Sequence, residues 1–118
     1  MPIVIEYYSP SCGYCKKFEP IFKRLQSYFF PIVDFIAVDC SSFLYSDYCT
    51  KKAIKGVPTI NFYYPSLRSK VMIKKDISHG MDYNSIVEYI KSSLPNHLIN
   101  FKCTSNTCIS EFKKVRSV

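Results

Sequence analysis

Two cysteines separated by two residues, Cys12-Gly13-Tyr14-Cys15, stand between segments of different hydrophobic periodicity. Residues 3–8, Ile-Val-Ile-Glu-Tyr-Tyr, predict a buried strand, and Ser9-Pro10-Ser11 ends it. From residue 13 to residue 29 the apolar side chains recur at the spacing of one helix face. The cysteine pair therefore opens a helix directly after a strand, and the chain must form a fold in which a β-α turn carries two thiols.

The rest of the chain continues the alternation of strands and helices. Further strands are predicted at residues 33–39, at 59–64 and around 71–73, and further helices at 41–54 and at 82–94. Pro20 lies inside the first helix and should kink it, while Asp82 is the expected N-cap of the last helix and Pro95 ends it. This order predicts an α/β domain with a four-stranded mixed sheet and helices on both faces.

Charge and composition limit the kinds of partner that this chain is expected to bind. The 118 residues carry a net charge of +7, but no run of like charge is long enough for a nucleic-acid-binding arm. The positive excess is expected to solubilise the protein, with acidic partners as the alternative. No apolar run approaches the ~20 residues of a membrane span, and the N-terminus does not resemble a signal peptide. We therefore expect neither nucleic acid nor a membrane as partner.

The position of the cysteine pair favours redox chemistry over metal binding. Cys12 is expected at the helix N-terminus, where free N–H groups and the helix dipole favour a thiolate, and Cys15 one turn into the interior. An exposed thiolate backed by a buried thiol suits thiol–disulfide exchange. Zinc would need two more ligands, which only Cys103 and Cys108 in the tail would supply, and an inert structural disulfide is the other alternative. We expect no metal and no organic cofactor.

The segment from Tyr7 to Lys16 (YYSPSCGYCK) resembles the active site of thioredoxin-fold proteins, and is more similar to protein disulfide isomerases than to thioredoxin itself. The resemblance covers roughly residues 3–94, and Pro20 matches the helix kink of the family. It implies that Val57–Pro58 is a cis peptide bond facing the cysteine pair. Under this resemblance the residues implied to bind substrate are Ser11, Tyr14, Val57, Pro58 and Gly80.

The resemblance also assigns a role to Glu6, six residues before Cys12. A buried carboxylate at this place helps to move the proton of the second cysteine, although an outward-facing acid is the alternative. Several family features are replaced: Ser11 stands for a tryptophan, Tyr14 for a histidine, Ala37 for a lysine and Met81 for an arginine. The exchange reaction is still expected, with an altered redox potential.

The fold is expected to be trimmed, because the usual strand and helix before the acid-bearing strand do not precede it here. Strand 33–39 should therefore be a sheet edge, covered by the tail or by a second subunit. Residues 1–94 form the expected thioredoxin-like domain. Residues 95–118 form a basic tail, expected to pack on that domain, with a last helix near 110–115.

The other four cysteines are expected to form structural disulfides. The spacing of Cys40 and Cys49 resembles a disulfide in the first thioredoxin domain of quiescin-type sulfhydryl oxidases, with free buried thiols as the alternative. Cys103 and Cys108 are expected to pair in the tail, with a shuttle pair or a bond from Cys49 to the tail as rivals. Such disulfides favour an oxidising compartment, the endoplasmic reticulum lumen or the secreted space.

These observations support two hypotheses about function. The first is a thiol–disulfide oxidoreductase or isomerase in which Cys12 forms a mixed disulfide that Cys15 resolves. Its partners would be proteins with disulfides or dithiols, and a reoxidising or reducing thiol partner such as glutathione or a sulfhydryl oxidase. The alternative is a thioredoxin-like binding or chaperone module that holds unfolded chains without redox turnover. A monomer or a weak dimer is expected.

Overall fold

The computed structural model describes residues 1–66, 68–69, 71–78 and 82–95. The predictions for Gly80, Met81, the tail and its cysteines lie outside the described residues.

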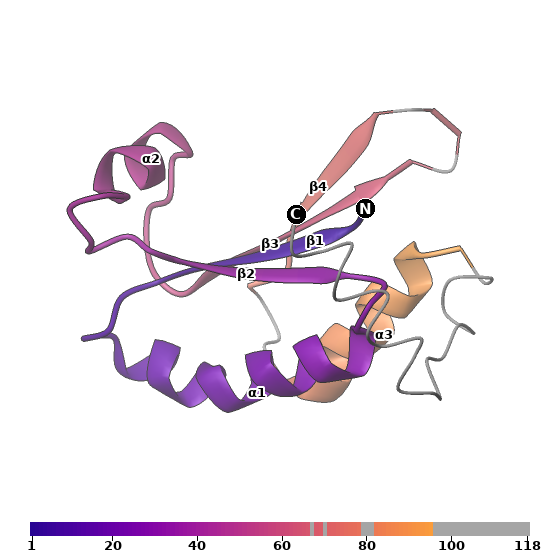
Figure 1. Cartoon of the computed structure of the whole chain (residues 1–118), viewed down its shortest axis with the longest axis horizontal. Coiled ribbons are helices and arrows are strands. Elements are labelled where there is room, and N and C mark those ends of the chain that lie inside the picture. The colour runs from indigo at the N-terminus through magenta and orange to yellow at the C-terminus, as the bar shows by residue number, and fades with distance from the viewer. Residues whose placement is uncertain (67, 70, 79–81, 96–118) are drawn as a thin grey trace.

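Seven elements follow one another along the described chain. They are β1 (Ile3–Tyr8), α1 (Gly13–Phe29), β2 (Asp34–Asp39), α2 (Ser46–Lys51), β3 (Thr59–Pro65), β4 (Met72–Asp76) and α3 (Tyr83–Ser93). The four strands form one sheet in the order β2-β1-β3-β4 (Figure 1). β1 pairs in parallel with β2 and antiparallel with β3, and β3 pairs antiparallel with β4. The predicted α/β fold with a mixed four-stranded sheet is therefore confirmed.

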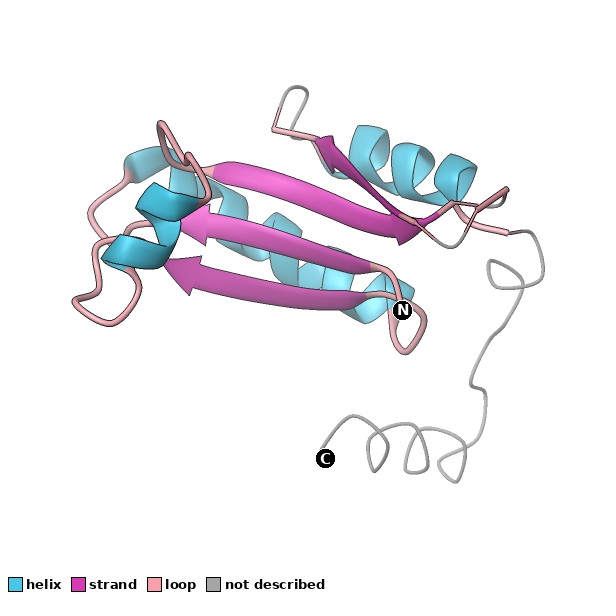
Figure 2. Ribbon diagram, turned by 90° about the horizontal axis from the view of Figure 1, so that it is seen from above, coloured by secondary structure: helices cyan, strands magenta, loops and turns pink. Residues whose placement is uncertain are grey.

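Helices lie on both faces of this sheet. α1 and α3 run below it in Figure 1, and Figure 2 shows the same helices behind the strands. α2 lies on the opposite face, at the end of the sheet where β1 and β2 finish. None of the helices in the described part of the chain is long and apolar enough to cross a membrane.

The core forms where α1 and α3 cover the sheet. The stripe predicted from the helical spacing on α1 is buried, and it consists of Cys15, Phe18, Phe22, Leu25 and Phe29. The rings of Phe22 and Phe35 meet edge to face, with centroids 5.5 Å apart. Ile90 of α3 is fully buried, and Leu25 and Ile60 are each 1% exposed. This packing fixes α1 against the sheet, and with it the turn that carries the cysteines.

The segment after β2 differs from the sequence prediction. A helix was expected over 41–54, but α2 covers only Ser46–Lys51. The Asp39 carboxylate accepts hydrogen bonds from the backbone N–H and the hydroxyl of Ser41, at 2.9 and 2.6 Å. The Ser42 hydroxyl accepts a hydrogen bond from the Leu44 N–H at 3.2 Å. Such local bonds from short polar side chains compete with helix formation and hold residues 41–45 as successive turns.

β2 is an edge strand of the sheet that the described residues form, as predicted for strand 33–39. Its partner β1 lies on one side only, and Ile36 in the middle of β2 is 45% exposed.

Candidate active site

Cys12 lies at the junction of β1 and α1. Its backbone N–H donates to the Ser9 carbonyl at 3.1 Å, which closes the turn made by Ser9-Pro10-Ser11. Its sulfur is the N-cap acceptor of α1 and receives the Cys15 N–H at 3.1 Å. This hydrogen bond satisfies one of the free N–H groups at the start of the helix. Cys12 is partly exposed, so this sulfur is accessible to a substrate.

Cys15 differs from Cys12 in both burial and proton affinity. It lies one turn into α1 and is 5% exposed. Burial, and then the hydrogen bond with the Cys12 side chain, raise the pKa of the Cys15 thiol to about 11. At neutral pH Cys15 therefore holds its proton and needs a base before it can act as a nucleophile.

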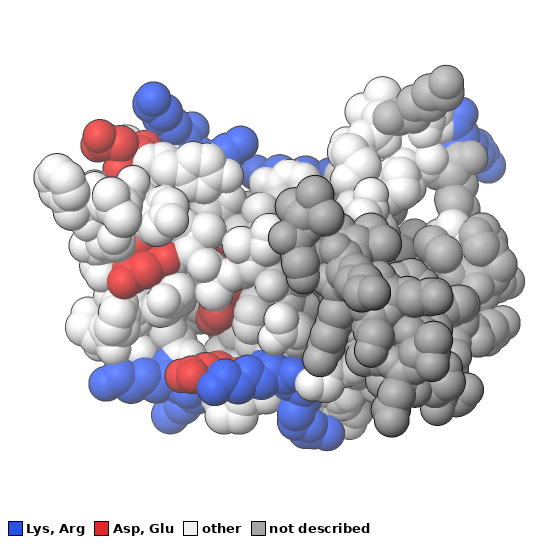
Figure 3. Space-filling view, viewed as in Figure 1, with Lys and Arg blue, Asp and Glu red and all other residues white. Residues whose placement is uncertain are grey.

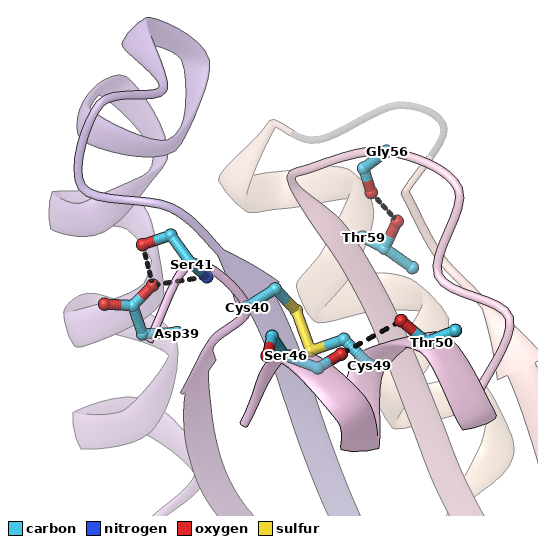
Figure 4. The surroundings of a disulfide bond; sticks show 8 residues. All are labelled: Asp39, Cys40, Ser41, Ser46, Cys49, Thr50, Gly56 and Thr59. Carbon is cyan, nitrogen blue, oxygen red and sulfur yellow. Dashed lines mark hydrogen bonds between the residues drawn. A yellow bond between two sulfur atoms is a disulfide. The ribbon is translucent and has the colours of Figure 1, made fainter. Parts of the chain in front are cut away.

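The loop before β3 faces the Cys12 sulfur. The Val57–Pro58 peptide bond is cis. The Cys12 thiol donates a hydrogen bond to the Val57 carbonyl oxygen, with 3.6 Å between sulfur and oxygen. The Thr59 hydroxyl donates to the Gly56 carbonyl at 2.6 Å, and this bond closes the turn that contains Pro58 (Figure 4). Residues 45 positions apart in sequence thus meet at one sulfur atom.

Glu6 lies behind the cysteine pair. Its side chain points to the α1 face of the sheet and is 5% exposed. One carboxylate oxygen, Oε2, has no hydrogen-bond partner among the described residues. Burial, and then the nearby Glu19 carboxylate, raise the pKa of Glu6 to about 7. A carboxyl group with this pKa exchanges its proton at neutral pH.

A cavity of about 560 Å³ connects Glu6 with Cys15. Glu19 and Lys23 of α1 line it, and these two side chains form an ion pair at 3.1 Å. Ala37 lines the opposite side, and it is the register partner of Glu6 across β1 and β2. The Glu6 and Cys15 side chains thus border the same cavity.

The two remaining residues of the motif lie at the surface. Tyr14 is 73% exposed, and the Lys17 ammonium group lies 5.7 Å from the centre of its ring. Ser11 is exposed and its hydroxyl is 3.1 Å from that of Ser9. Of the candidate site residues, the structure brings together Cys12, Cys15, Val57 and Pro58, with Glu6 behind them. Within the described ranges no cluster of His, Cys, Asp or Glu suits a metal ion.

A disulfide lies beside this site. The sulfurs of Cys40 and Cys49 are 2.08 Å apart, and the bond joins the end of β2 to α2 (Figure 4). The Cys40 N–H donates to the Tyr8 carbonyl at 2.9 Å, so the disulfide adjoins the strand that leads to Cys12. The Tyr7 ring stacks on that of Tyr48 in α2, with centroids 6.4 Å apart. Sequence reasoning missed this aromatic contact between the acid-bearing strand and α2.

The site combines a thiol pair at a helix N-terminus, a facing cis-proline loop and a buried acid. A comparison with models of protein families agrees with this description. Residues 1–92 match the family described as Thioredoxin. The chain belongs to the thioredoxin family. This confirms the family resemblance drawn from the segment around Cys12.

Curated relatives share this domain within longer proteins. A mitochondrial thioredoxin domain-containing protein of Schizosaccharomyces pombe is 30% identical over 95 residues, which cover 80% of this chain and 26% of that protein. A protein disulfide-isomerase of Ricinus communis is 30% identical over 117 residues, which cover 94% of this chain and 22% of the relative. The chain thus spans about a quarter of the length of these relatives.

Solved structures agree with the fold. The crystal structure of the Trx4 domain of ERdj5 superposes with a TM-score of 0.68 at 28% identity, covering 78% of each chain. A structure titled as a malarial protein superposes with a TM-score of 0.63 at 25% identity, covering 80% of this chain and 99% of the other. The likeness of the Cys40–Cys49 spacing to quiescin-type sulfhydryl oxidases stays a prediction.

Proposed function

We propose that this protein is a thiol–disulfide oxidoreductase that acts on protein substrates through Cys12 and Cys15. One observation carries the proposal: the Cys12 sulfur caps α1 and is partly exposed, while Cys15 beside it is buried with a raised pKa. This asymmetry gives the two thiols different roles, since one is available for attack and the other is held in reserve.

The first step is an exchange at Cys12. Its thiolate attacks one sulfur of a substrate disulfide, so that a Cys12–substrate disulfide forms and the other substrate sulfur leaves as a thiolate. The Val57 carbonyl oxygen, 3.6 Å from the Cys12 sulfur, lies where an extended substrate backbone would donate an N–H. Val57 and Pro58 are therefore proposed to align the substrate. Ser11, Tyr14 and Gly80 are proposed to complete the binding surface.

The second step releases the substrate. Cys15 loses its proton toward the Glu6 carboxylate and attacks the Cys12 sulfur, which expels the second substrate sulfur as a thiolate. The pair is then oxidised to a disulfide and the substrate disulfide is reduced to two thiols. Glu6 suits this role because its pKa of about 7 lets it accept a proton at neutral pH. The reverse sequence oxidises a substrate dithiol.

We extend this proposal to isomerase activity on proteins and to an oxidising compartment. The protein disulfide-isomerase relatives support substrates that are proteins rather than small molecules. The Cys40–Cys49 disulfide supports a compartment in which thiols are oxidised. After a substrate disulfide is reduced, reduced glutathione would return the Cys12–Cys15 disulfide to two thiols. After a substrate dithiol is oxidised, a sulfhydryl oxidase or oxidised glutathione would return the two thiols to a disulfide.

Trapping of the intermediate tests the mechanism. A Cys15→Ser variant, mixed with a peptide that contains a disulfide, should accumulate a covalent adduct on Cys12, visible on non-reducing gels and by mass. A Cys12→Ser variant should form no adduct and should lose disulfide reduction of insulin. The Cys12→Ser/Cys15→Ser double variant is the matched control. Retention of activity by Cys12→Ser would disprove the proposal.

A further inference from the structure

The cavity beside Glu6 has the size and the walls of a ligand site. Its volume of about 560 Å³ falls within the range of roughly 300–1,000 Å³ that is usual for sites of small molecules. The buried rings of Phe22 and Phe35 line it, with their centroids 5.5 Å apart, and Glu6 adds a buried carboxyl group. A molecule held in this cavity would therefore meet apolar surface beside a carboxyl group.

The cavity opens to solvent between α1 and β2. Its exposed lining residues include Lys16, Glu19 and Lys23 on α1 and Ala37 on β2. Since β2 is the edge strand of the sheet that the described residues form, no further strand of that sheet covers Ala37. Figure 3 shows acidic atoms between β2 and the row of Lys and Arg side chains that follows α1. A small molecule can therefore enter the cavity from this side.

The Glu6 carboxyl has an unused hydrogen-bond acceptor inside the cavity. Its side chain is 5% exposed, and Oε2 accepts no hydrogen bond from any described residue. Burying a carboxylate is costly unless a hydrogen-bond donor or a positive charge compensates it. A ligand with a positively charged N–H donor would supply both at Oε2.

Two lysines border the cavity, but they do not supply this charge. The Lys23 ammonium group is 3.1 Å from Glu19 Oε1, and the two side chains are 71% and 63% exposed. Lys16 is exposed as well. Both lysines thus lie at the solvent side of the cavity, and one of them is already paired with a carboxylate.

The groups that act on Glu6 make its surroundings negative. Burial, and then the Glu19 carboxylate, raise the pKa of Glu6. Tyr8 and Cys15 are the other titratable groups of the lining besides the lysines, and neither carries a positive charge in any protonation state. An anionic ligand would be repelled by Glu6 and Glu19, and a neutral one would leave the Glu6 carboxylate without a countercharge. The surroundings therefore favour a cation.

We propose that this cavity binds a small organic cation with an apolar body, whose ammonium group pairs with the Glu6 carboxylate while the body lies against Phe22 and Phe35. The bound cation would stabilise the carboxylate and so make Glu6 a weaker base. Cys15 would then lose its proton less readily, and the mixed disulfide on Cys12 would break down more slowly. This effect on the reaction rests on the proposed function, whereas the binding does not.

Benzylamine is the probe for binding, because it is a cation with an apolar ring, and benzyl alcohol is its uncharged counterpart. In NMR titrations of the full chain, benzylamine should bind about tenfold more tightly at pH 8 than at pH 6. The reason is that the ionised fraction of Glu6, with its pKa of about 7, rises from about one-tenth to about nine-tenths. At pH 8 benzyl alcohol should bind about tenfold more weakly than benzylamine. Equal binding of the two molecules, or no binding of benzylamine, would overturn the proposal.

Two leucine variants test where benzylamine binds. Ala37→Leu fills the mouth of the cavity and keeps Glu6, so the affinity should fall about tenfold or more. Val38→Leu is the matched control, because the next residue of a strand points to the opposite face, and its affinity should stay within about twofold of the wild type. Glu6→Gln should remove the dependence of binding on pH. Equal affinities of the two leucine variants, or an unchanged pH dependence in Glu6→Gln, would overturn the proposal.

Reaction rates separate this inference from the proposed function. At pH 8, saturating benzylamine should slow breakdown of the mixed disulfide about threefold or more and leave its formation unchanged. If benzylamine binds as expected but Cys12 forms no adduct with a disulfide peptide, the cation site is supported and the proposed function fails. If exchange proceeds but benzylamine does not bind, the cation site is disproved and the proposed function stands. An unchanged rate of breakdown at saturation would overturn the effect on Cys15.

Discussion

Glu6 on β1 lies directly opposite Ala37 on β2, and both line the cavity that reaches Cys15. The small side chain of Ala37 leaves the buried carboxyl without a cation across the strand pair. Burial, and then the Glu19 carboxylate, raise the pKa of Glu6 to about 7. This pairing determines how the stability and the proposed chemistry should depend on pH.

Stability should fall as the pH rises through the range in which Glu6 titrates. Its pKa is 4.5 in its ordinary state and about 7 in the folded protein, so between these values the folded state holds a proton that the unfolded chain has lost. The free energy of unfolding of the wild type, compared with that of Glu6→Gln, is therefore most favourable below pH 4.5. This advantage is lost by about pH 7. The variant should gain about 2 kcal/mol relative to the wild type between pH 5 and pH 8. Urea unfolding at both pH values measures this, and an unchanged difference would contradict it.

Placing a cation opposite the carboxyl should restore a lower pKa. Ala37→Lys puts an ammonium group beside Glu6, which favours the charged form of the acid. The titration midpoint of the Glu6 carboxyl, followed by NMR, should move from about 7 toward 4.5. Ala37→Gln is the control, since it adds a side chain without a charge. Equal midpoints in the two variants would show that charge at residue 37 does not reach Glu6.

Release of substrate should depend on Glu6 more than its capture does. Cys15 is buried and, with a pKa of about 11, needs a base, whereas the Cys12 sulfur is partly exposed at the helix start. Glu6→Gln should slow breakdown of the mixed disulfide about 10²-fold at pH 7 and leave its formation nearly unchanged. Rapid-quench measurement of both rates tests this. An equal loss in the two rates would indicate a general structural effect instead.

Loss of the Cys40–Cys49 disulfide should lower the free energy of unfolding. The sequence separation of its cysteines is 9, and closing a loop of this size stabilises the folded state by about 2–3 kcal/mol in the chain-entropy model. The Cys40→Ser/Cys49→Ser variant should show this loss in urea under non-reducing conditions. Its unfolding midpoint should change little when a reductant is added, whereas that of the wild type should fall. Equal midpoints for variant and untreated wild type would contradict the prediction.

The buried Leu25 side chain of α1 should contribute more to the free energy of unfolding than an exposed apolar side chain does. Leu25 is 1% exposed beneath the sheet, so Leu25→Ala should cost about 2–5 kcal/mol of unfolding free energy. Leu44→Ala makes the same chemical change at a residue that is 76% exposed and should cost less than about 0.5 kcal/mol. Chemical unfolding of both variants provides the comparison. Similar costs would mean that Leu25 is not part of a tightly packed core.

Local patterns were sufficient to predict most of the elements. Hydrophobic spacings typical of strands and helices predicted β1, α1, β3 and α3 close to their observed bounds. In these elements the buried apolar residues recur at regular intervals along the chain. The prediction of one helix over residues 41–54 was partly wrong. There the hydrogen bonds of Asp39 and Ser42 favour turns, and these depend on backbone geometry that apolar periodicity does not report.

The sequence by itself determined the order of elements, the place of Cys12 at a helix start and the burial of Cys15 on the apolar stripe of α1. Those features depend on residues close together in the chain, for which spacing is enough. Tertiary packing set the Val57 carbonyl 3.6 Å from the Cys12 sulfur, a meeting that the family resemblance implied but that residue spacing did not, and it set Ala37 beside Glu6 and left Phe43 exposed after β2. These relationships arise from strand register and from packing between distant segments, and a single sequence does not record which residues will meet.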